Sequence, residues 1–253
     1  MNTTIVPERF TGKTAIVTGA GSGIGKAIAQ RILTEGGTVV ASDVSAERLA
    51  AFAEEAGSDR LRTVVSDVTS EADVAKLVAA ADGPIDAVAN NAGIMDGFLP
   101  AHEVEDELWQ RVFDINVMGV MRLTRAVLPG MLERGTGTIV NTASEAGIRG
   151  NAAGAAYTAS KHAVVGFTKN TAFMYGRKGI RVNAVAPGGV ATNVDGTFKS
   201  DYAAQLMGPA FQTLGFAPAT PEQLASAITW LLSDDSSNVN GVVLASDGGW
   251  SAQ

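Results

Sequence analysis

The sequence predicts one α/β domain built around a doubly wound parallel sheet of about seven strands, with helices on both faces of the sheet. Two observations predict this class. Short β-branched and apolar runs, typical of strands buried on both faces, alternate with segments of helical periodicity along the chain. Regular alternation of strand and helix implies a parallel sheet. Because the chain has no repeat, linker or low-complexity segment, residues 1–253 are expected to form a single domain.

Composition narrows the classes of function. The chain has 253 residues, of which 46% are hydrophobic and 18% are charged, as in a globular protein. Its net charge of −7 argues against nucleic acid or an anionic membrane as a partner, since both attract a basic face. The chain has no cysteine and only two histidines, which excludes disulfides, a thiol nucleophile and a His-built zinc site, and no metal is expected. Without an apolar leader or membrane span, the sequence predicts a cytoplasmic protein.

The first unit of the chain is typical of dinucleotide binding. A predicted strand over 14–18 runs into a turn with four glycines, a helix, and a second strand over 38–41 that closes on Asp43. Glycines let the backbone approach a pyrophosphate, and the free N–H groups of a helix N-terminus attract phosphates. An acid about 20 residues past the turn can accept hydrogen bonds from an adenosine ribose. The unit therefore predicts a Rossmann-type site, and a glycine-rich turn without a ligand is the alternative.

Charge decides which dinucleotide the sequence predicts. The carboxylate of Asp43 would repel the 2′-phosphate of NADP. Ser22 and Val44 stand where an arginine could have bound that phosphate, so we expect no compensating cation here. The sequence therefore predicts NAD rather than NADP.

The rest of the chain continues the alternation. Ser45 and Ser70 precede helices as N-caps, and Thr220 with Pro221 opens the last helix. Pro129 and Gly130 mark the C-terminal part of the long helical segment that begins at Glu105. Further strands are predicted over 61–66, 85–89, 137–142, 180–186 and 242–245, and helices over 46–56, 71–80, 105–128, 152–175 and 221–232.

Four positions are candidates for catalysis, each with a plainer alternative. Tyr157 and Lys161 lie four apart on a predicted helix and share a face, so the ammonium is expected to lower the tyrosine pKa toward that of a general base. A pair with this spacing also arises by chance. Asn116 lies in the middle of a helix, where it either has a task or is an exposed neutral position. Ser144 leaves the carboxyl end of a strand, where ligands bind, although turn residues also occur there.

Five motifs in this order resemble the short-chain dehydrogenase/reductase family in its single-domain form, over nearly the whole chain. They are Thr18-Gly19-xxx-Gly23-x-Gly25, Asn90-Asn91-Ala92-Gly93, the set Asn116, Ser144, Tyr157 and Lys161, Pro187-Gly188 with Thr192, and Ser246-Asp247-Gly248-Gly249.

The resemblance implies a role for each catalytic candidate. Tyr157 would exchange a proton with the substrate oxygen, and Lys161 would lower the Tyr157 pKa and bind the nicotinamide ribose. Ser144 would orient the carbonyl or alcohol, and Asn116 would hold a water that relays protons through Lys161. The resemblance also implies a homotetramer that pairs the long helices near Asn116 and Tyr157, with the small residues at 152–155 allowing close approach.

The sequence and the resemblance together define the candidate site. The predicted catalytic residues are Asn116, Ser144, Tyr157 and Lys161. The predicted cofactor-binding residues are Gly19, Ser22, Gly23, Ile24, Gly25, Asp43, Val44, Asp67, Val68, Asn90, Asn91, Gly93, Tyr157, Lys161, Pro187, Gly188, Val190 and Thr192.

The segment 190–216 is the predicted substrate lid, because apolar and aromatic residues alternate there with glycines. An ordinary packed helix and loop is the alternative. Glu145 and Arg149 either contact polar substrate groups or are surface charges and loop anchors. His102 and His162 are expected to be structural. Additional apolar wall is predicted from Ile94, Met95, Phe98 and Trp109.

The leading hypothesis is an NAD-dependent enzyme that transfers a hydride between the cofactor and a fairly apolar, cyclic secondary alcohol or ketone. A 3-oxoacyl-thioester reductase, an activity the resembled family also contains, is an alternative that commonly uses NADPH. A non-catalytic NAD-binding sensor is an alternative from another class. In each case the expected partner is a small molecule.

Overall fold

The computed structural model describes residues 3–193, 196–214 and 217–252, and within them seven parallel strands form one sheet. Their order is β3-β2-β1-β4-β5-β6-β7. The strands are β1 (Thr14–Thr18), β2 (Thr38–Asp43), β3 (Leu61–Val65), β4 (Ala87–Asn90), β5 (Gly137–Thr142), β6 (Ile180–Pro187) and β7 (Val243–Ser246). The strand order reverses between β1 and β4, which is where doubly wound sheets bind ligands. The predicted fold class is confirmed.

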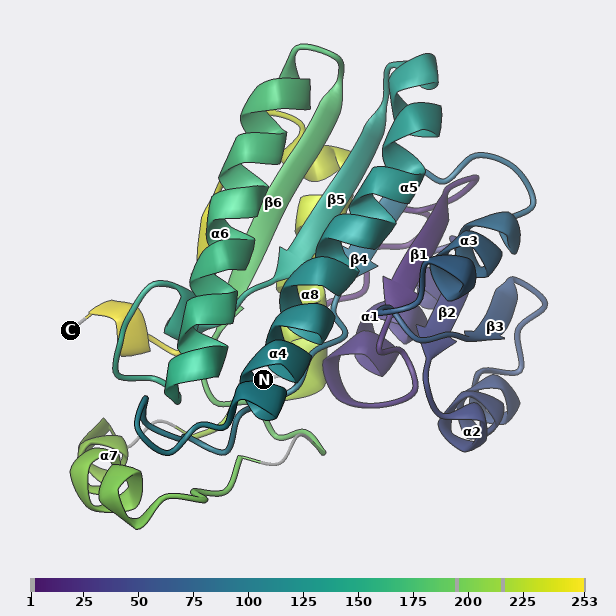
Figure 1. The fold of residues 1–253 in the computed structure, drawn as a ribbon. Helices are drawn as coiled ribbons and strands as arrows, with labels where there is room; N and C mark the ends of the chain where they lie inside the picture. The colour runs from purple at the N-terminus through teal and green to yellow at the C-terminus, as the bar shows by residue number, and fades with distance from the viewer. Residues whose placement is uncertain (1–2, 194–195, 215–216, 253) are drawn as a thin grey trace.

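Helices cover both faces of the sheet (Figure 1). One face is covered by α1 (Gly23–Thr34), α2 (Ala46–Ala56) and α8 (Pro221–Leu232), and the other by α3 (Glu71–Ala79), α5 (Gly119–Arg134) and α6 (Ala155–Gly176). Side chains alternate between these layers along each strand. In β1, Ala15 and Val17 face the first layer and Ile16 faces the second, so the apolar run of this strand is buried on both sides.

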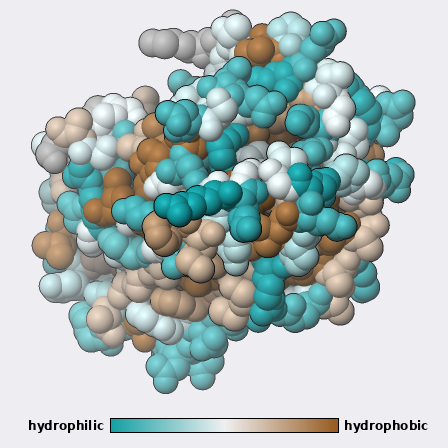
Figure 2. Space-filling model, turned by 90° about the horizontal axis from the view of Figure 1, so that it is seen from above, coloured by the Kyte–Doolittle hydropathy of each residue, from teal (hydrophilic) through white to brown (hydrophobic). Residues whose placement is uncertain are grey.

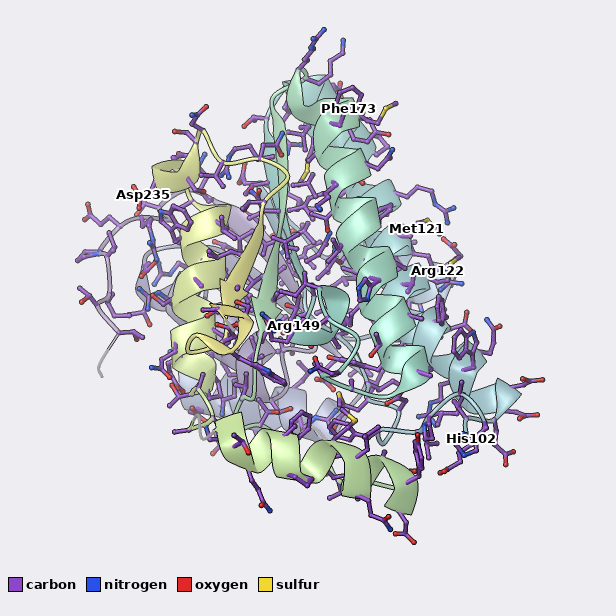
Figure 3. All side chains as sticks on the ribbon, turned by 90° about the vertical axis from the view of Figure 1, so that its left-hand side faces the viewer. His102, Met121, Arg122, Arg149, Phe173 and Asp235 are labelled. Carbon is purple, nitrogen blue, oxygen red and sulfur yellow. The ribbon has the colours of Figure 1, made fainter. Side chains whose placement is uncertain are left out.

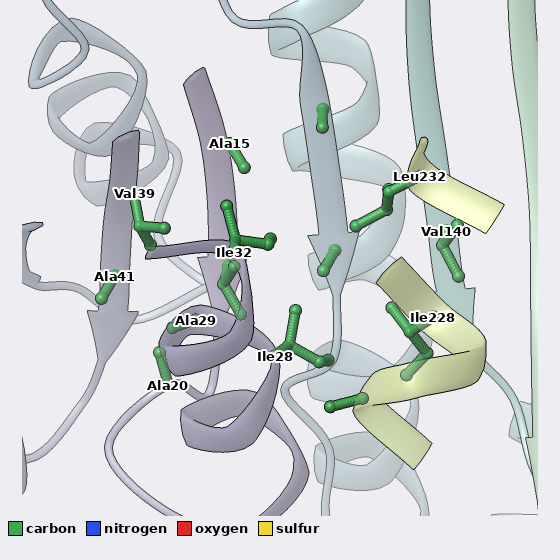
Figure 4. Packing of buried hydrophobic residues seen from close by; sticks show 14 of the residues in the cluster. Ala15, Ala20, Ile28, Ala29, Ile32, Val39, Ala41, Val140, Ile228 and Leu232 are labelled. Atoms are coloured by element: carbon green, nitrogen blue, oxygen red, sulfur yellow. The ribbon is translucent and has the colours of Figure 1, made fainter. Parts of the chain in front are cut away.

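The packing of α1 positions the glycine turn. Ile28 and Ile32 of α1 are fully buried and lie against the strands beside Ile228 of α8 (Figure 4). Burying a side chain of this size stabilises the fold by about 1.5–3 kcal/mol. The N-terminus of α1 is therefore held at the carboxyl end of β1, where the turn begins.

The predicted helix over 105–128 is three elements in the structure. α4 (Asp106–Phe113) leads into a π-helical turn, Asp114–Met118, and then into α5. Asn116 lies in the π-helical turn. Such turns insert an extra residue into a helix and are frequent at functional sites.

Pro129 does not end the helix as its position suggested. α5 continues past Pro129 to Arg134 and ends at Gly135, whose φ of 68° is in the left-handed region. A proline inside a helix removes one hydrogen bond and costs about 3 kcal/mol. The buried side chains of Leu128 and Met131 pack on the sheet on both sides of the proline and offset this cost.

Other boundaries differ from the prediction by up to three residues. α6 begins at Ala155 rather than at 152, because Gly154 has an extended backbone and acts as its N-cap. β4 begins at Ala87 rather than at 85, and Asp86 instead uses its carboxylate to accept a hydrogen bond from the Thr14 N–H. β7 covers Val243–Ser246, one residue later than predicted.

The segment predicted to be a lid contains α7 (Asp201–Leu214), which lies beyond the carboxyl ends of the strands (Figure 1). Residues 194–195 and 215–216 of this segment lie outside the described residues. The opposite end of the molecule shows hydrophobic residues interspersed among hydrophilic ones (Figure 2). Within the described residues, no helix has the length and apolar character that crossing a bilayer requires.

Candidate active site

Loops from the carboxyl ends of the strands meet around one large cavity of about 2250 Å³. Most of the predicted site residues line it: Gly19, Ser22, Gly23, Ile24, Asp43, Val44, Asp67, Val68, Asn91, Gly93, Ser144, Tyr157, Lys161, Pro187, Gly188, Val190 and Thr192. Gly25, Asn90 and Asn116 do not line it. The cavity extends from the glycine turn past Tyr157 to α7.

The glycine turn presents free backbone donors to this cavity. Ser22 is the N-cap of α1 but makes no side-chain cap, and the first N–H groups of a helix have no partner within it. A Cβ on Gly25 would lie 2.2 Å from the Gly19 carbonyl oxygen, so only glycine permits this approach of helix to turn. Exposed N–H groups at the positive end of a helix suit a pyrophosphate. The turn therefore fits a dinucleotide. Gly25 does not line the cavity but allows the helix to pack closely against the turn.

Asn90, a predicted cofactor-binding residue, turns its side chain away from the cavity. Its side chain is buried, and its Nδ2 donates to Asn141 Oδ1 at 2.8 Å and to Thr124 Oγ1 at 3.2 Å. These bonds join β4 to β5 and α5. Asn91 lines the cavity instead, because consecutive residues leaving a strand point in opposite directions.

Thr18 holds the turn that follows β4. Its Oγ1 accepts hydrogen bonds from the N–H groups of Asn91 at 3.0 Å and Ala92 at 3.1 Å. The Asn91 Nδ2 donates in return to the Thr18 carbonyl at 3.1 Å. The two loops that flank the sheet's switch point are therefore tied to one another.

The end of β2 carries an ion pair that the sequence interpretation missed. Asp43 is 6% exposed, its Oδ2 accepts from the Gly21 N–H at 3.0 Å, and its Oδ1 accepts from the Ser45 N–H at 2.9 Å. Arg48 donates to the same Oδ1 at 2.5 Å while staying half-exposed at the cavity wall. The expectation that no cation stands beside Asp43 was therefore wrong, because residues five apart meet where α2 turns back over the end of β2.

Tyr157, Lys161 and Ser144 meet on the cavity wall. The Lys161 Nζ lies 5.4 Å from the centre of the Tyr157 ring and donates to the Thr142 carbonyl at 2.7 Å. Ser144 Oγ is fixed as the cap of the short helix after β5, where it accepts from the Ala146 N–H at 3.1 Å. The Ser144 hydroxyl also hydrogen-bonds the Tyr157 phenol. The three side chains come from the ends of β5 and the first turns of α6.

The electrostatics of this group differ from the expectation. Burial raises the pKa of the Tyr157 phenol to about 12, the hydrogen bond from Ser144 lowers it, and the Asp96 carboxylate raises it. Burial also lowers the pKa of the Lys161 ammonium to about 8. We expected Lys161 to lower the Tyr157 pKa. The Tyr157 pKa is raised instead, because burial removes the water that would solvate a phenolate.

Asn116 lies behind the cavity rather than on its wall. Its Nδ2 donates to the Ile94 carbonyl at 3.0 Å, and its Oδ1 accepts from the Ile94 N–H at 2.9 Å. Nδ2 also donates to Ser160 Oγ at 3.2 Å, and Ser160 Oγ donates to the Tyr157 carbonyl at 2.7 Å. The side chain thus connects the loop after β4 to the backbone of Tyr157, and the predicted water relay stays a prediction.

Glu145 and Arg149 are partners rather than free surface charges. Glu145 is 1% exposed, and its Oε2 lies 3.1 Å from the Arg149 Nε. Burial and the neighbouring Asp247 carboxylate raise the pKa of Glu145 to about 7, and Arg149 lowers it. Arg149 lies between α6 and the C-terminal segment, above α7 (Figure 3). The pair anchors the loop after Ser144, and neither residue lines the cavity.

An aromatic wall closes the other end of the cavity. The Phe98 ring packs on Phe198 with centroids 4.5 Å apart, and Phe211 contacts both rings. Trp250 meets the edge of Phe211 at 5.6 Å. Phe98, Phe211 and Trp250 line the cavity together with three predicted wall residues, Ile94, Met95 and Trp109.

The two histidines lie away from this chemistry. His162 Nδ1 contacts the Thr158 carbonyl at 2.9 Å on the exposed side of α6. His102 packs against the edge of Tyr202 near the end of α4 (Figure 3).

Sequence reasoning missed Thr18, Arg48 and Asp96 as parts of the site. Thr18 is part of the first motif but was given no role. The spacing of Arg48 from Asp43 was a usable signal, since both flank a predicted N-cap. Asp96 gave no signal, because Tyr157, whose N–H donates to it, lies 61 residues along the chain and only the tertiary fold brings the two together.

Comparisons with known proteins agree with this geometry. Residues 13–203 match the family model described as short chain dehydrogenase. The chain is 44% identical over 253 residues to 3beta-hydroxysteroid dehydrogenase 2 of Eggerthella lenta, covering 96% of each chain. It is 40% identical over 250 residues to cis-4-hydroxycyclohexanecarboxylate dehydrogenase of Sinomonas cyclohexanicum, covering 97% of this chain and 99% of the relative.

A solved structure extends the comparison. It is described as a putative NAD(P) dependent gluconate 5-dehydrogenase from Beutenbergia cavernae with bound NADP. Its TM-score is 0.85 at 36% identity, and the match covers 98% of this chain and 100% of that chain.

Replacing Gly25 with alanine tests the built shape of the glycine turn. Since the added Cβ would collide with the Gly19 carbonyl, Gly25→Ala is expected to weaken dinucleotide binding at least about tenfold and to lower the free energy of unfolding by about 1–3 kcal/mol. Calorimetric titration and denaturant unfolding measure the two effects.

Gly166→Ala is the matched control, because Gly166 is also helical but exposed with open space around its Cβ position. It should leave binding unchanged and stabilise α6 by about 1 kcal/mol. Equal effects of the two substitutions would show that the turn does not require Gly25.

Proposed function

The chain belongs to the short-chain dehydrogenase family, and from this premise we propose that it transfers a hydride between NAD(H) and an apolar, ring-bearing secondary alcohol or its ketone. Family membership makes it an oxidoreductase of CH–OH groups that uses a nicotinamide cofactor. The observation that carries the proposal is the position of the Tyr157 phenol and the Ser144 hydroxyl, between the glycine turn and the aromatic wall of one cavity.

The chain's own residues handle the proton of the reaction. In alcohol oxidation, the substrate hydroxyl gives its proton to the Tyr157 oxygen, and in ketone reduction the phenol returns it. Ser144 donates a hydrogen bond to the same substrate oxygen and orients it. The Lys161 ammonium donates one hydrogen to the Thr142 carbonyl, and a second hydrogen remains to donate to the nicotinamide ribose. The nicotinamide, when bound, supplies or accepts the hydride.

The cofactor proposal rests on Asp43. Its carboxylate is buried and fixed by three donors at the position where a ribose hydroxyl would seek an acceptor. A 2′-phosphate at this position would meet that negative charge. Two observations favour NADP. One is Arg48, whose guanidinium is already paired with Asp43, and the other is the NADP bound in the solved structure at 36% identity. We therefore propose NAD as the preferred cofactor.

The substrate proposal rests on the aromatic wall. Flat and apolar side chains stack well against ring systems, and Phe98, Phe211 and Trp250 supply them within the cavity. The names of two relatives describe ring alcohols, a hydroxysteroid and a hydroxycyclohexanecarboxylate. The segment from Val190 to α7 is proposed as the lid over this substrate.

The homotetramer and the cytoplasmic location stay predictions. Within 152–155, Ala153 and Gly154 are buried against their own chain and Ala152 and Ala155 are half-buried, so only the latter two keep exposed surface for the predicted subunit contact. The C-terminal half of α6 offers Phe173, 84% exposed, and Met174, 58% exposed (Figure 3). We propose that these apolar side chains lie in a subunit contact, and sedimentation of Phe173→Asp against the unchanged protein tests this.

A substrate screen tests the function directly. Ring-bearing secondary alcohols are expected to have kcat/KM at least about tenfold above linear secondary alcohols of equal carbon number, since the aromatic wall is preformed. Spectrophotometric detection of NADH measures both series, and phosphorylated alcohols serve as the charged comparison. Turnover of highly charged compounds alone would overturn the substrate class.

Asp43→Ala tests the cofactor choice. The substitution removes the repelling carboxylate and frees Arg48, so the ratio of kcat/KM for NAD to that for NADP is expected to fall at least about a hundredfold. The double variant Asp43→Ala with Arg48→Ala should lose the gain in NADP use. Comparable kcat/KM for both cofactors in the unchanged protein would contradict the proposal.

Tyr157→Phe tests the proton transfer. The variant should bind NAD normally while kcat falls by a factor of about 10² to 10⁴. Because the raised pKa of Tyr157 leaves little phenolate at neutral pH, kcat/KM for oxidation by the unchanged protein should rise with pH into the alkaline range. Reduction needs the neutral phenol and should stay level near neutrality. Near-normal turnover by Tyr157→Phe would remove this mechanism.

A further inference from the structure

Asp96 is a buried carboxylate next to the reacting groups that the mechanism above does not use. It lies in the loop after β4 and is 1% exposed. Its Oδ2 accepts from the Tyr157 N–H at 2.8 Å, and its Oδ1 accepts from the Phe98 N–H at 3.1 Å. Among the described residues, no lysine, arginine or histidine nitrogen forms an ion pair with it. A buried charge without a cation needs such hydrogen bonds to be tolerated.

The first bond completes the N-terminus of the catalytic helix. Gly154, the N-cap of α6, has no side chain to accept a hydrogen bond, and the first turn of the helix has no acid. Asp96 supplies the missing acceptor from another part of the chain, and its charge suits the positive end of the helix. A Cβ on Gly154 would lie 2.5 Å from both Asp96 oxygens, so this approach depends on glycine. The bonded N–H belongs to the residue that carries the catalytic phenol.

The second bond holds a strained turn that builds the aromatic wall. Phe98 has a φ of 60°, a conformation that costs a residue other than glycine about 1–3 kcal/mol. The bond to Asp96 stabilises this conformation, which directs the Phe98 ring toward Phe198 and Phe211. The same loop is tied to both sides: its Leu99 carbonyl accepts from Ala155, and its Gly97 carbonyl accepts from Lys199.

We propose that Asp96 is a positioning residue that sets the catalytic Tyr157 and the substrate-facing Phe98 relative to one another through its two carboxylate oxygens. The proposal rests on the proposed function for the identity of the substrate. Both oxygens must accept, so a carboxamide cannot replace the carboxylate, because its NH₂ group would face a backbone N–H. A ring substrate held by Phe98 therefore presents its oxygen to the phenol in one geometry.

The charge of Asp96 should affect the pH dependence of the reaction, which a purely structural role would not do. Tyr157 faces Lys161 from its own helix, Ser144 from the loop after β5, and Asp96 from the loop after β4. The Asp96 carboxylate raises the pKa of the phenol. Its removal should therefore move the rising limb of the oxidation pH profile to lower pH, even as turnover falls.

Asp96→Asn in the full-length protein tests the proposal. We expect kcat for a ring alcohol to fall about tenfold to a hundredfold, its KM to rise at least about threefold, and the NAD dissociation constant to stay within about twofold. The pH profile should shift to lower pH. Asp86→Asn is the matched control, because Asp86 also accepts a backbone N–H, at 2.9 Å from Thr14, but at the opposite end of β4.

A second variant covers a failure of Asp96→Asn to fold. Gly154→Ala displaces the same carboxylate from the helix side and should change kcat and KM in the same direction. Unchanged kcat, KM and pH profile in either folded variant, or equal changes in Asp86→Asn, would overturn the proposal.

A titration without substrate separates this proposal from the proposed function. The chain has three tyrosines, so tyrosinate absorbance can be followed in the absence of turnover. In Asp96→Asn one phenol should titrate at lower pH than in the unchanged protein, and this difference should vanish when Tyr157→Phe is added. If the unchanged protein oxidises no ring alcohol, the function fails while this titration still supports or overturns the role of Asp96.

Discussion

All seven strands described here run parallel, so their carboxyl ends share one edge of the sheet, and the whole site depends on this constraint. The glycine turn, Asp43, Asn91, Ser144 and Pro187 lie at the carboxyl ends of five different strands, and they line one cavity because these strands end together. The reversal of strand order between β1 and β4 leaves a crevice there that no crossover helix fills. Tyr157 reaches the same edge because α6 begins on it.

Burial sets the chemistry of the groups at that edge. The same loss of solvation raises the pKa of the Tyr157 phenol and lowers that of the Lys161 ammonium, so both shifts favour neutral forms. Asp43 is buried as well, yet it keeps backbone N–H donors and Arg48 around it. The site therefore combines a phenol that stays neutral near pH 7 with an acid that backbone N–H groups and Arg48 surround. Both environments line the same cavity.

Local signals predicted most of the fold and the chemical groups of the site. Ser45, Ser70 and Thr220 were predicted N-caps, and the helices begin directly after them. Pro129 failed as a stop signal because tertiary packing of its neighbours outweighs the lost hydrogen bond. Arg48 was missed because the cofactor argument considered only Ser22 and Val44 as positions for a cation. It did not consider a side chain of the following helix that reaches back to Asp43. The inward orientation of the Asn90 side chain was not predicted, because a motif names residues without saying which side chains face the cavity.

The sequence by itself determined the alternation of strand and helix, the glycine turn, and the residue types that can carry a proton. These follow from local periodicity and from side-chain chemistry, which need no distant contact. Only the tertiary structure decided that Asp96 caps the helix of Tyr157 and that the Tyr157 pKa is raised. Each of these depends on burial or on groups brought together across the chain, and neither property can be read from neighbours in sequence.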